Sequence, residues 1–250
     1  MSTEARPKEH RSVGVVSRAV YDRAEKIAGE LIAGRDEVRV LDVGCGSQSS
    51  IQIPGTTYLI GIDVDEKGLK ANPSLDERLL IGVEDMDFPN ESFDGVVSHY
   101  SLEHVAEPDV AIGKMVRVLK LGGVLILVVP NVRSAKALIA KITPTRFHVW
   151  AYRNLAGRKQ ITTEGEHGGP FPTVLDASLR EAQLTRLLRT LGLEVRNIEK
   201  FEDPNQREFR ERIGLTGGKW DAVRSGTAKV FGEEHVPGNS EFIIVAQRVA

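Results

Sequence analysis

The chain has 250 residues, of which 33 are lysine or arginine and 35 are aspartate or glutamate, so its formal net charge is −2. This near balance gives no support to work on nucleic acid or on an anionic membrane, both of which favour basic surfaces. The single cysteine, Cys45, excludes an intramolecular disulfide and a thiolate metal cluster. With no apolar stretch long enough to cross a bilayer and no leader pattern at the polar start, we expect a soluble cytoplasmic protein.

The first predicted element is an amphipathic helix from Ser17 to Ile32, which follows a flexible segment at 1–14 and is closed by Gly34. Beyond it, apolar strands alternate with helical stretches, which indicates an α/β fold built on a parallel sheet. The predicted strands are Val38–Val43, Tyr58–Ile62, Leu79–Ile81, Asp94–Val97, Val124–Val129, Glu194–Phe201 and Glu241–Gln247.

Two further helices are expected among these strands. One spans Pro108–Leu119, and the other opens on the capping-box pattern Ser178-Leu179-Arg180-Glu181 and is closed by Gly192. Gly122-Gly123 predicts a tight turn into the central strand. We interpret residues 1–250 as one domain.

Two long segments interrupt this alternation, at 131–173 and 202–239. Their aromatic residues favour ordered cap segments over the strand ends rather than disordered linkers.

A glycine turn and an acid stand at the ends of the first two predicted strands. Asp42-Val43-Gly44-Cys45-Gly46 ends the first strand, and Asp63 ends the second. Glycines allow the backbone to approach a ligand closely, and an acid at a strand tip can bind two ribose hydroxyls. The pair predicts a strand, a glycine turn and a helix that bind a nucleoside-containing cofactor.

Four segments in a fixed order carry a family resemblance: Val40–Gly46, Gly61–Asp65, Phe88–Asp94, and Leu102–Val105 leading to Leu119–Gly123. With them the chain resembles the class I S-adenosylmethionine-dependent methyltransferases, over roughly Arg18–Asn131 and the C-terminal strands. The resemblance implies a doubly wound, mostly parallel, seven-stranded Rossmann-like sheet with an antiparallel C-terminal strand. It also implies S-adenosyl-L-methionine as the cofactor.

The same resemblance implies roles for residues at the strand ends. Gly44 and Gly46 would pass beneath the methionine part, Asp42 would orient the turn or meet the ammonium group, and Asp63 would bind the ribose diol. The other cofactor-binding candidates are Val64 beside Asp63, the adenine-facing Val83, Glu84 and Asp85, and Ser98 and His99 near the sulfonium.

The chain departs from the family pattern at two positions. Gln48 replaces a third glycine and Ile53-Pro54-Gly55 breaks helices, so we expect a short first helix. Gly82 stands where relatives often have an acid, so the adenine contact is expected to pass to Glu84 or Asp85.

Methyl transfer to a hydroxyl needs a base, most simply a histidine. We expect His148, in the cap segment 131–173, or His104 to serve, with His99 and His167 as further candidates; a reaction without a base stays open. No metal site is expected, because Tyr100 stands where some relatives have a metal-binding carboxylate. Arg146, Arg153, Arg158 and Lys159 could hold an anionic group or form a solvated face.

The sequence thus predicts an enzyme that methylates a small molecule, most simply at a hydroxyl of a sugar, natural product or quinone precursor. We expect a monomer or homodimer with no nucleic-acid or membrane partner. The alternatives are an RNA or protein methyltransferase, a dinucleotide oxidoreductase, and a non-catalytic binding relative. Ser98–Ser101 is not the Asn/Asp-Pro-Pro-aromatic turn typical of base methylation.

Overall fold

The structure, a computed structural model, describes residues 15–132, 176–232 and 235–250. Its centre is one seven-stranded sheet in the order β3-β2-β1-β4-β5-β7-β6. The strands are β1 (Arg39–Val43), β2 (Tyr58–Asp63), β3 (Glu77–Leu80), β4 (Phe93–His99), β5 (Leu119–Pro130), β6 (Leu193–Phe201) and β7 (Glu241–Arg248). Only β7 runs against its neighbours, between β5 and β6. The predicted fold class, with its antiparallel C-terminal strand, is confirmed.

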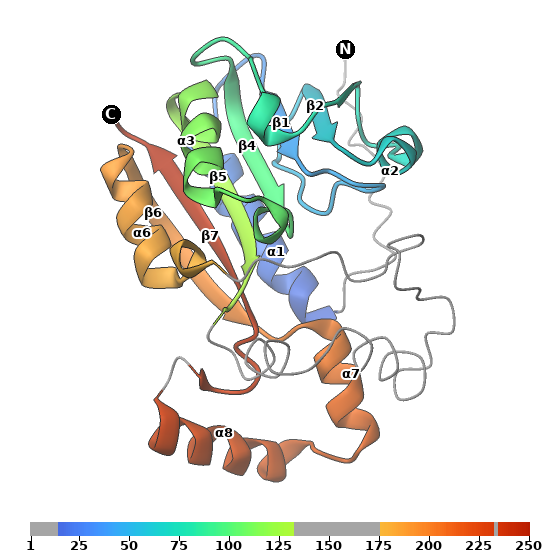
Figure 1. Cartoon of the computed structure of the whole chain (residues 1–250), viewed down its shortest axis with the longest axis vertical. Helices are drawn as coiled ribbons and strands as arrows, with labels where there is room; N and C mark the ends of the chain where they lie inside the picture. Colours follow the sequence, from blue (N-terminus) through green and yellow to red (C-terminus); the bar gives the residue numbers. More distant parts are fainter. Residues whose placement is uncertain (1–14, 133–175, 233–234) are drawn as a thin grey trace.

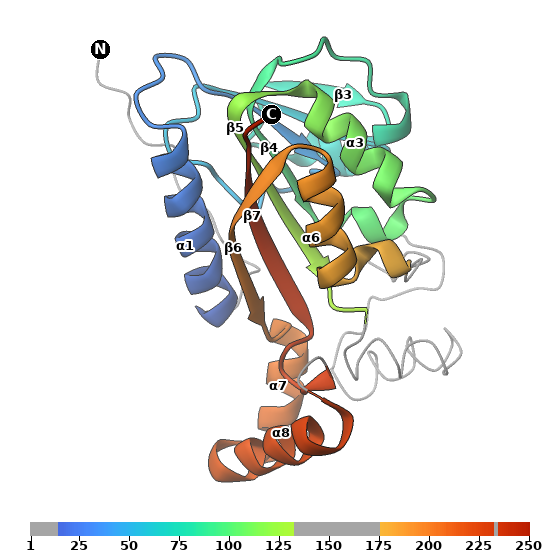
Figure 2. The same cartoon turned by 90° about the vertical axis from the view of Figure 1, so that its left-hand side faces the viewer.

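Helices cover both faces of the sheet (Figure 2). The α-helices are α1 (Val15–Leu31), α2 (Glu66–Ala71), α3 (Pro108–Val118), α6 (Glu181–Thr190), α7 (Pro204–Arg212) and α8 (Gly217–Phe231). Three short 3-10 turns accompany them, η1 (Val83–Asp85), η2 (Leu102–His104) and η3 (Ala177–Leu179). α1 lies on one face, while α3 and α6 lie on the other.

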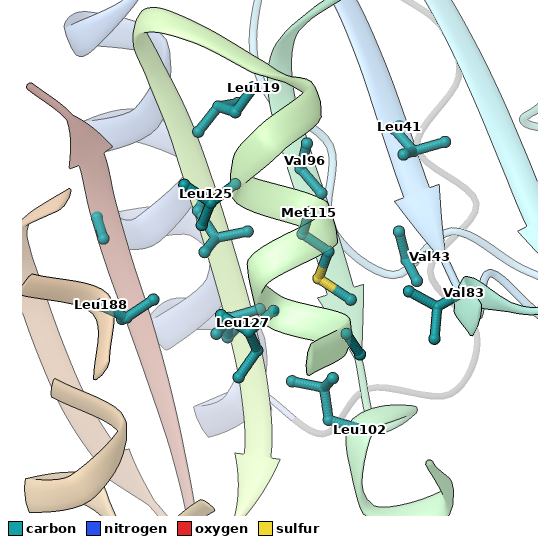
Figure 3. Packing of buried hydrophobic residues seen from close by; sticks show 14 of the residues in the cluster. Leu41, Val43, Val83, Val96, Leu102, Met115, Leu119, Leu125, Leu127 and Leu188 are labelled. Atoms are coloured by element: carbon teal, nitrogen blue, oxygen red, sulfur yellow. The ribbon is translucent and has the colours of Figure 1, made fainter. Parts of the chain in front are cut away.

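The hydrophobic core has one part on each face of the sheet. Val96 of β4 and Leu125 of β5 face α3, where Met115 packs against them (Figure 3). On the other face, Val97 and Ile126 pack with Tyr21 of α1. The alternation along β4 and β5 buries both faces of the central strands, which explains their nearly continuous apolar sequences.

Three local predictions were wrong. The described residues between β1 and β2 form no helix. Pro54 and Gly55 interrupt the segment, and Ile51 and Ile53 are buried although they lie in irregular structure. β5 begins at Leu119, so the bend at Gly122, with φ of 73°, lies inside the strand, where the β4–β5 register shifts.

The capping box is the third correction. Asp176, not Ser178, supplies the side-chain cap, since its carboxylate accepts from the Ser178 N–H at 2.6 Å and opens η3. α6 then starts at Glu181 with Arg180 at its N-cap and no side-chain cap bond. An acid two residues upstream therefore takes the role that the pattern gave to the serine.

The segment 202–239 carries α7 and α8, which lie beyond the carboxyl ends of β5 and β6 (Figure 1). Apart from its first two residues, the predicted cap segment 131–173 lies outside the described residues, so its role stays a prediction. Among the described helices, none is long and apolar enough to span a membrane.

Candidate functional site

The glycine turn leaves the carboxyl end of β1 between β2 and β4. The Gly44 N–H donates to the Ile62 carbonyl at 2.9 Å, which ties the turn to β2. Gly44 and Gly46 have φ of 70° and 51°, a region that glycine adopts without strain. A Cβ on Gly44 would lie 2.3 Å from the Ser101 Cβ, whereas a Cβ on Gly46 would meet nothing within 4 Å. Gly44 is therefore fixed by packing, and Gly46 borders open space that a ligand can enter.

Asp63, at the tip of β2, holds this turn in place. Its carboxylate accepts from the Gly46 N–H at 2.7 Å and from the Asp65 N–H at 2.8 Å. Asp65, rather than Asp63, caps α2 by accepting from the Lys67 N–H. Because an ionised carboxylate has about four acceptor positions, Asp63 can still accept from two ribose hydroxyls.

Asp42 is the buried acid of the site, with 3% of its surface exposed. Burial raises the pKa of its carboxyl from 3.8 to about 7, the charge of Asp63 adds to this rise, and a hydrogen bond with Ser49 opposes it. A cation placed beside Asp42 would favour its charged form. The site thus suits a ligand that brings an ammonium group to the glycine turn.

The loop after β3 places Glu84 over Gly82. A Cβ on Gly82 would lie 2.8 Å from the Glu84 Oε2 and 3.4 Å from a methyl carbon of Val64. Val64 is 78% exposed, while the Val83 side chain is buried, so only the backbone of Val83 can reach a ligand. Glu84 and Asp85 were the two acids expected to make the adenine contact in place of an acid at position 82. The Glu84 carboxylate is the one that occupies the space beside Gly82.

The turn after β4 closes the other side of the glycine turn. The hydroxyls of Ser98 and Ser101 are hydrogen-bonded at 2.5 Å, and Ser101 donates to the Val43 carbonyl at 3.1 Å. Ser98 is thereby held beside the end of β1, and its place near the cofactor stays a prediction.

His99 follows Ser98 and packs among aromatic rings. Its Nε2 lies 3.0 Å from the Tyr21 hydroxyl, and its ring lies 4.4 Å from the Tyr100 ring, centroid to centroid. Burial lowers the pKa of the imidazole from 6.5 to about 4, so His99 is neutral at physiological pH. Tyr100 has φ of 51°, a strained conformation for a non-glycine residue that costs on the order of 1–3 kcal/mol.

The described structure does not bring the predicted catalytic residues together at the end of β4. His104 lies in η2 with an exposed side chain. His148 and His167, and the Arg146, Arg153, Arg158 and Lys159 group, lie outside the described residues, so their roles stay predictions. Within the described ranges, no three His, Cys, Asp or Glu side chains are grouped as metal ligands.

Sequence reasoning missed the residues that come from distant elements. Tyr21 was expected only as part of an apolar helix face, yet its hydroxyl bonds to His99, 78 positions away. Ser101 and Glu241 were missed as well. A tyrosine in an otherwise aliphatic stripe, whose hydroxyl needs a partner when buried, was the available signal for Tyr21.

Comparison with known proteins gives the class. Residues 41–127 match the model of a methyltransferase domain. An uncharacterised protein of Methanocaldococcus jannaschii is 27% identical over 108 residues, which cover 43% of this chain and 43% of that protein. The phosphatidylethanolamine N-methyltransferase of Cereibacter sphaeroides is 32% identical over 100 residues, which cover 36% of this chain and 49% of that enzyme.

The chain thus spans a little under half the length of these curated relatives. The crystal structure of a putative methyltransferase from Bacillus halodurans C-125 superposes with a TM-score of 0.52 and 18% identity, covering 92% of this chain and 99% of that one. That likeness establishes the fold. Sheet order, glycine turn and the methyltransferase domain matched over residues 41–127 together give this chain the fold of the class I S-adenosylmethionine-dependent methyltransferases, as the sequence motifs predicted. The cofactor of this class is S-adenosylmethionine.

Proposed function

We propose that this protein transfers the methyl group of S-adenosylmethionine to a small-molecule acceptor, at a hydroxyl oxygen. The observation that carries the proposal is the carboxyl edge of the sheet, where Gly46 is held by the Asp63 carboxylate and borders open space. In an open α/β sheet, ligands bind at this edge.

The residues at this edge fit the cofactor part by part. Asp63 would hold the ribose, Glu84 and the exposed Val64 would border the adenine, and Asp42 would face the ammonium group of the methionine part. The cofactor supplies a methyl group already activated by the sulfonium. The chain's own task is therefore to align the acceptor with that methyl group and to exclude water.

A small acceptor is supported by charge and by the helical insertion. The net charge of −2 is unlike that of proteins that bind nucleic acid. α7 and α8 lie beyond the carboxyl ends of β5 and β6, next to the edge where the acceptor would enter (Figure 1). The acceptor proton needs a base, for which His148 and His104 remain the candidates.

An amine acceptor is the second candidate. One relative is a phosphatidylethanolamine N-methyltransferase, at 32% identity over 100 residues. A neutral amine needs no base before it attacks the methyl group, so this reaction could proceed without either histidine. An RNA or protein acceptor has no comparable support.

Two measurements test the proposal. Calorimetry should show binding of S-adenosylmethionine and S-adenosylhomocysteine and no binding of NAD; NAD binding without either sulfur nucleoside would refute it. Incubation with cell extract and methyl-labelled cofactor should then label a compound in the small-molecule fraction. Mass analysis should find a methyl ether or ester, and a methylated amine would favour the second candidate.

A further inference from the structure

A chain of three polar aromatic side chains joins α1 to the carboxyl end of β4. Tyr21 comes from α1, and His99 and Tyr100 come from the end of β4, beside the turn that packs against Gly44. The Tyr21 ring meets the His99 ring edge to face, with centroids 5.5 Å apart, and the Phe201 ring at the end of β6 also meets it edge to face, at 5.6 Å. The Tyr21 hydroxyl is thus held in one place, with His99 in reach.

The His99 ring decides where the Tyr21 proton points. The Tyr21 hydroxyl lies 3.0 Å from His99 Nε2. In a neutral pair of phenol and imidazole, the hydroxyl is the stronger donor and the unprotonated ring nitrogen is the stronger acceptor, so Tyr21 donates and Nε2 accepts.

The surrounding charges keep both tyrosines protonated. Burial raises the pKa of the Tyr21 and Tyr100 hydroxyls, and the carboxylates of Glu241 and Asp203 raise it further, against a small opposing effect of Arg18 on Tyr21. Glu241 starts β7 between the ends of β5 and β6, where its register partners are Pro130 and Phe201. Neutral hydroxyls therefore remain donors over the whole physiological range of pH.

We propose that Tyr21 is a positioning residue, which holds His99 as the neutral tautomer with its proton on Nδ1, so that His99 donates a hydrogen bond to the oxygen of the methyl acceptor. This rests on the proposed function and deepens it. With Nε2 occupied by Tyr21, Nδ1 is the nitrogen left for a ligand, and it has no hydrogen-bond partner among the described residues.

The arrangement matches an oxygen nucleophile. In the transfer, one lone pair of the acceptor oxygen attacks the methyl carbon and the carbon–sulfur bond breaks, which leaves S-adenosylhomocysteine and a methylated oxygen. The acceptor's proton goes to a base other than His99, whose Nε2 already accepts from Tyr21. The Nδ1–H bond holds the acceptor oxygen in line with the methyl group, and it is strongest while the base withdraws the proton, before the electron pair of the oxygen moves to the methyl carbon. A neutral amine nitrogen has a single lone pair, which its attack uses, so it could not accept this hydrogen bond while it attacks.

Nitrogen-15 spectra of the imidazoles in the protein bound to S-adenosylhomocysteine test the tautomer, with His99→Gln used to assign the signal. We expect His99 to be protonated at Nδ1 alone, and the Tyr21→Phe variant to show both tautomers. Tyr58→Phe is the matched control, because its hydroxyl bonds to Glu77 at the far end of β2. A wild-type His99 protonated at Nε2 would overturn the proposal.

Labelling of the small-molecule fraction of cell extract tests the role in transfer. At saturating methyl-labelled cofactor, Tyr21→Phe should lower the labelling rate about 10-fold or more, while affinity for S-adenosylhomocysteine stays within about twofold. Tyr58→Phe should label at the wild-type rate. Full labelling by Tyr21→Phe with an unchanged tautomer overturns the role of Tyr21 and leaves the proposed function standing. A wild type that binds neither nucleoside and labels nothing overturns both.

Discussion

The carboxyl edge of the sheet has two halves of different construction. Around β1 and β2 the site is made of backbone and acids, with Gly44, Gly46, Asp42 and Asp63 close together in sequence. Around β4 it is made of rings that come from separate elements, with His99 held by Tyr21 of α1. Each half contains an ionisable group withdrawn from water, Asp42 fully and His99 in part, and burial moves the two pKa values in opposite directions, up to about 7 at Asp42 and down to about 4 at His99.

This difference shows which kind of ligand each half of the site can bind. Both groups tend towards their neutral forms, because burial penalises charge of either sign. Asp42 can regain its charge when a cation binds beside it. His99 cannot, because its ring lies among aromatic side chains and already accepts a hydrogen bond. The first half therefore suits the charged cofactor, and the second suits a neutral polar acceptor.

The largest expected effect separates the two glycines of the first half. Gly44→Ala combines a positive φ with a Cβ placed 2.3 Å from the Ser101 Cβ, so it should lower the free energy of unfolding by about 3 kcal/mol. Gly46→Ala has the positive φ alone and should lose about 1 kcal/mol. Urea denaturation of both variants measures the difference. Equal losses would show that Ser101 does not fix Gly44.

Asp63→Ala should weaken cofactor binding by more than about 1.5 kcal/mol, since charge-assisted bonds to the ribose and to the Gly46 N–H are lost together. Calorimetry with S-adenosylhomocysteine measures this loss. Asp65→Ala is the control, because it removes the cap of α2 and should cost about 1 kcal/mol of stability with little effect on binding. If Asp63→Ala binds as wild type does, Asp63 serves only the turn.

Asp42 should make stability depend on pH. The folded protein keeps a proton up to about pH 7 that the unfolded chain loses near 4, so the free energy of unfolding should fall as pH rises between these values and stay level above. One such group gives a slope of at most about 1.4 kcal/mol per pH unit. Asp42→Asn should remove this slope in urea denaturation from pH 4.5 to 8. A slope equal to wild type would place the titrating group elsewhere.

The same comparison shows what could be predicted from sequence. The strands and the glycine turn were predicted well, because apolar runs and glycines act locally; the boundaries of β1, β2 and β7 differ from prediction by one residue. The helix expected after the turn is absent among the described residues, and Ile51 and Ile53 pack into the core from an irregular segment. Tertiary packing there overrides the pattern of the wider family.

The second half of the site could not be predicted, because no local pattern encodes it. Tyr21, His99 and Glu241 are far apart in sequence and meet only because β7 inserts between β5 and β6 while α1 covers that face of the sheet. The positive φ of Tyr100 is likewise imposed by packing rather than by residue type. The roles of residues that come together only in the tertiary structure can be recognised only once that structure is known.

The smallest expected effect is the pH dependence that His99 gives to the free energy of unfolding, which has the opposite sign to that of Asp42. Here the folded-state pKa of about 4 lies below the ordinary 6.5, so the stabilising contribution is present above pH 6.5 and is lost as pH falls towards 4. Because His99 is only partly buried, we expect a loss below about 1 kcal/mol. Asp42→Asn removes the opposing slope, so urea denaturation of that variant from pH 6.5 to 4.5 should show the loss, and adding His99→Gln should diminish it. An imidazole that titrates near 6.5 by NMR would contradict the prediction, and it would show that the rings around His99 do not exclude water.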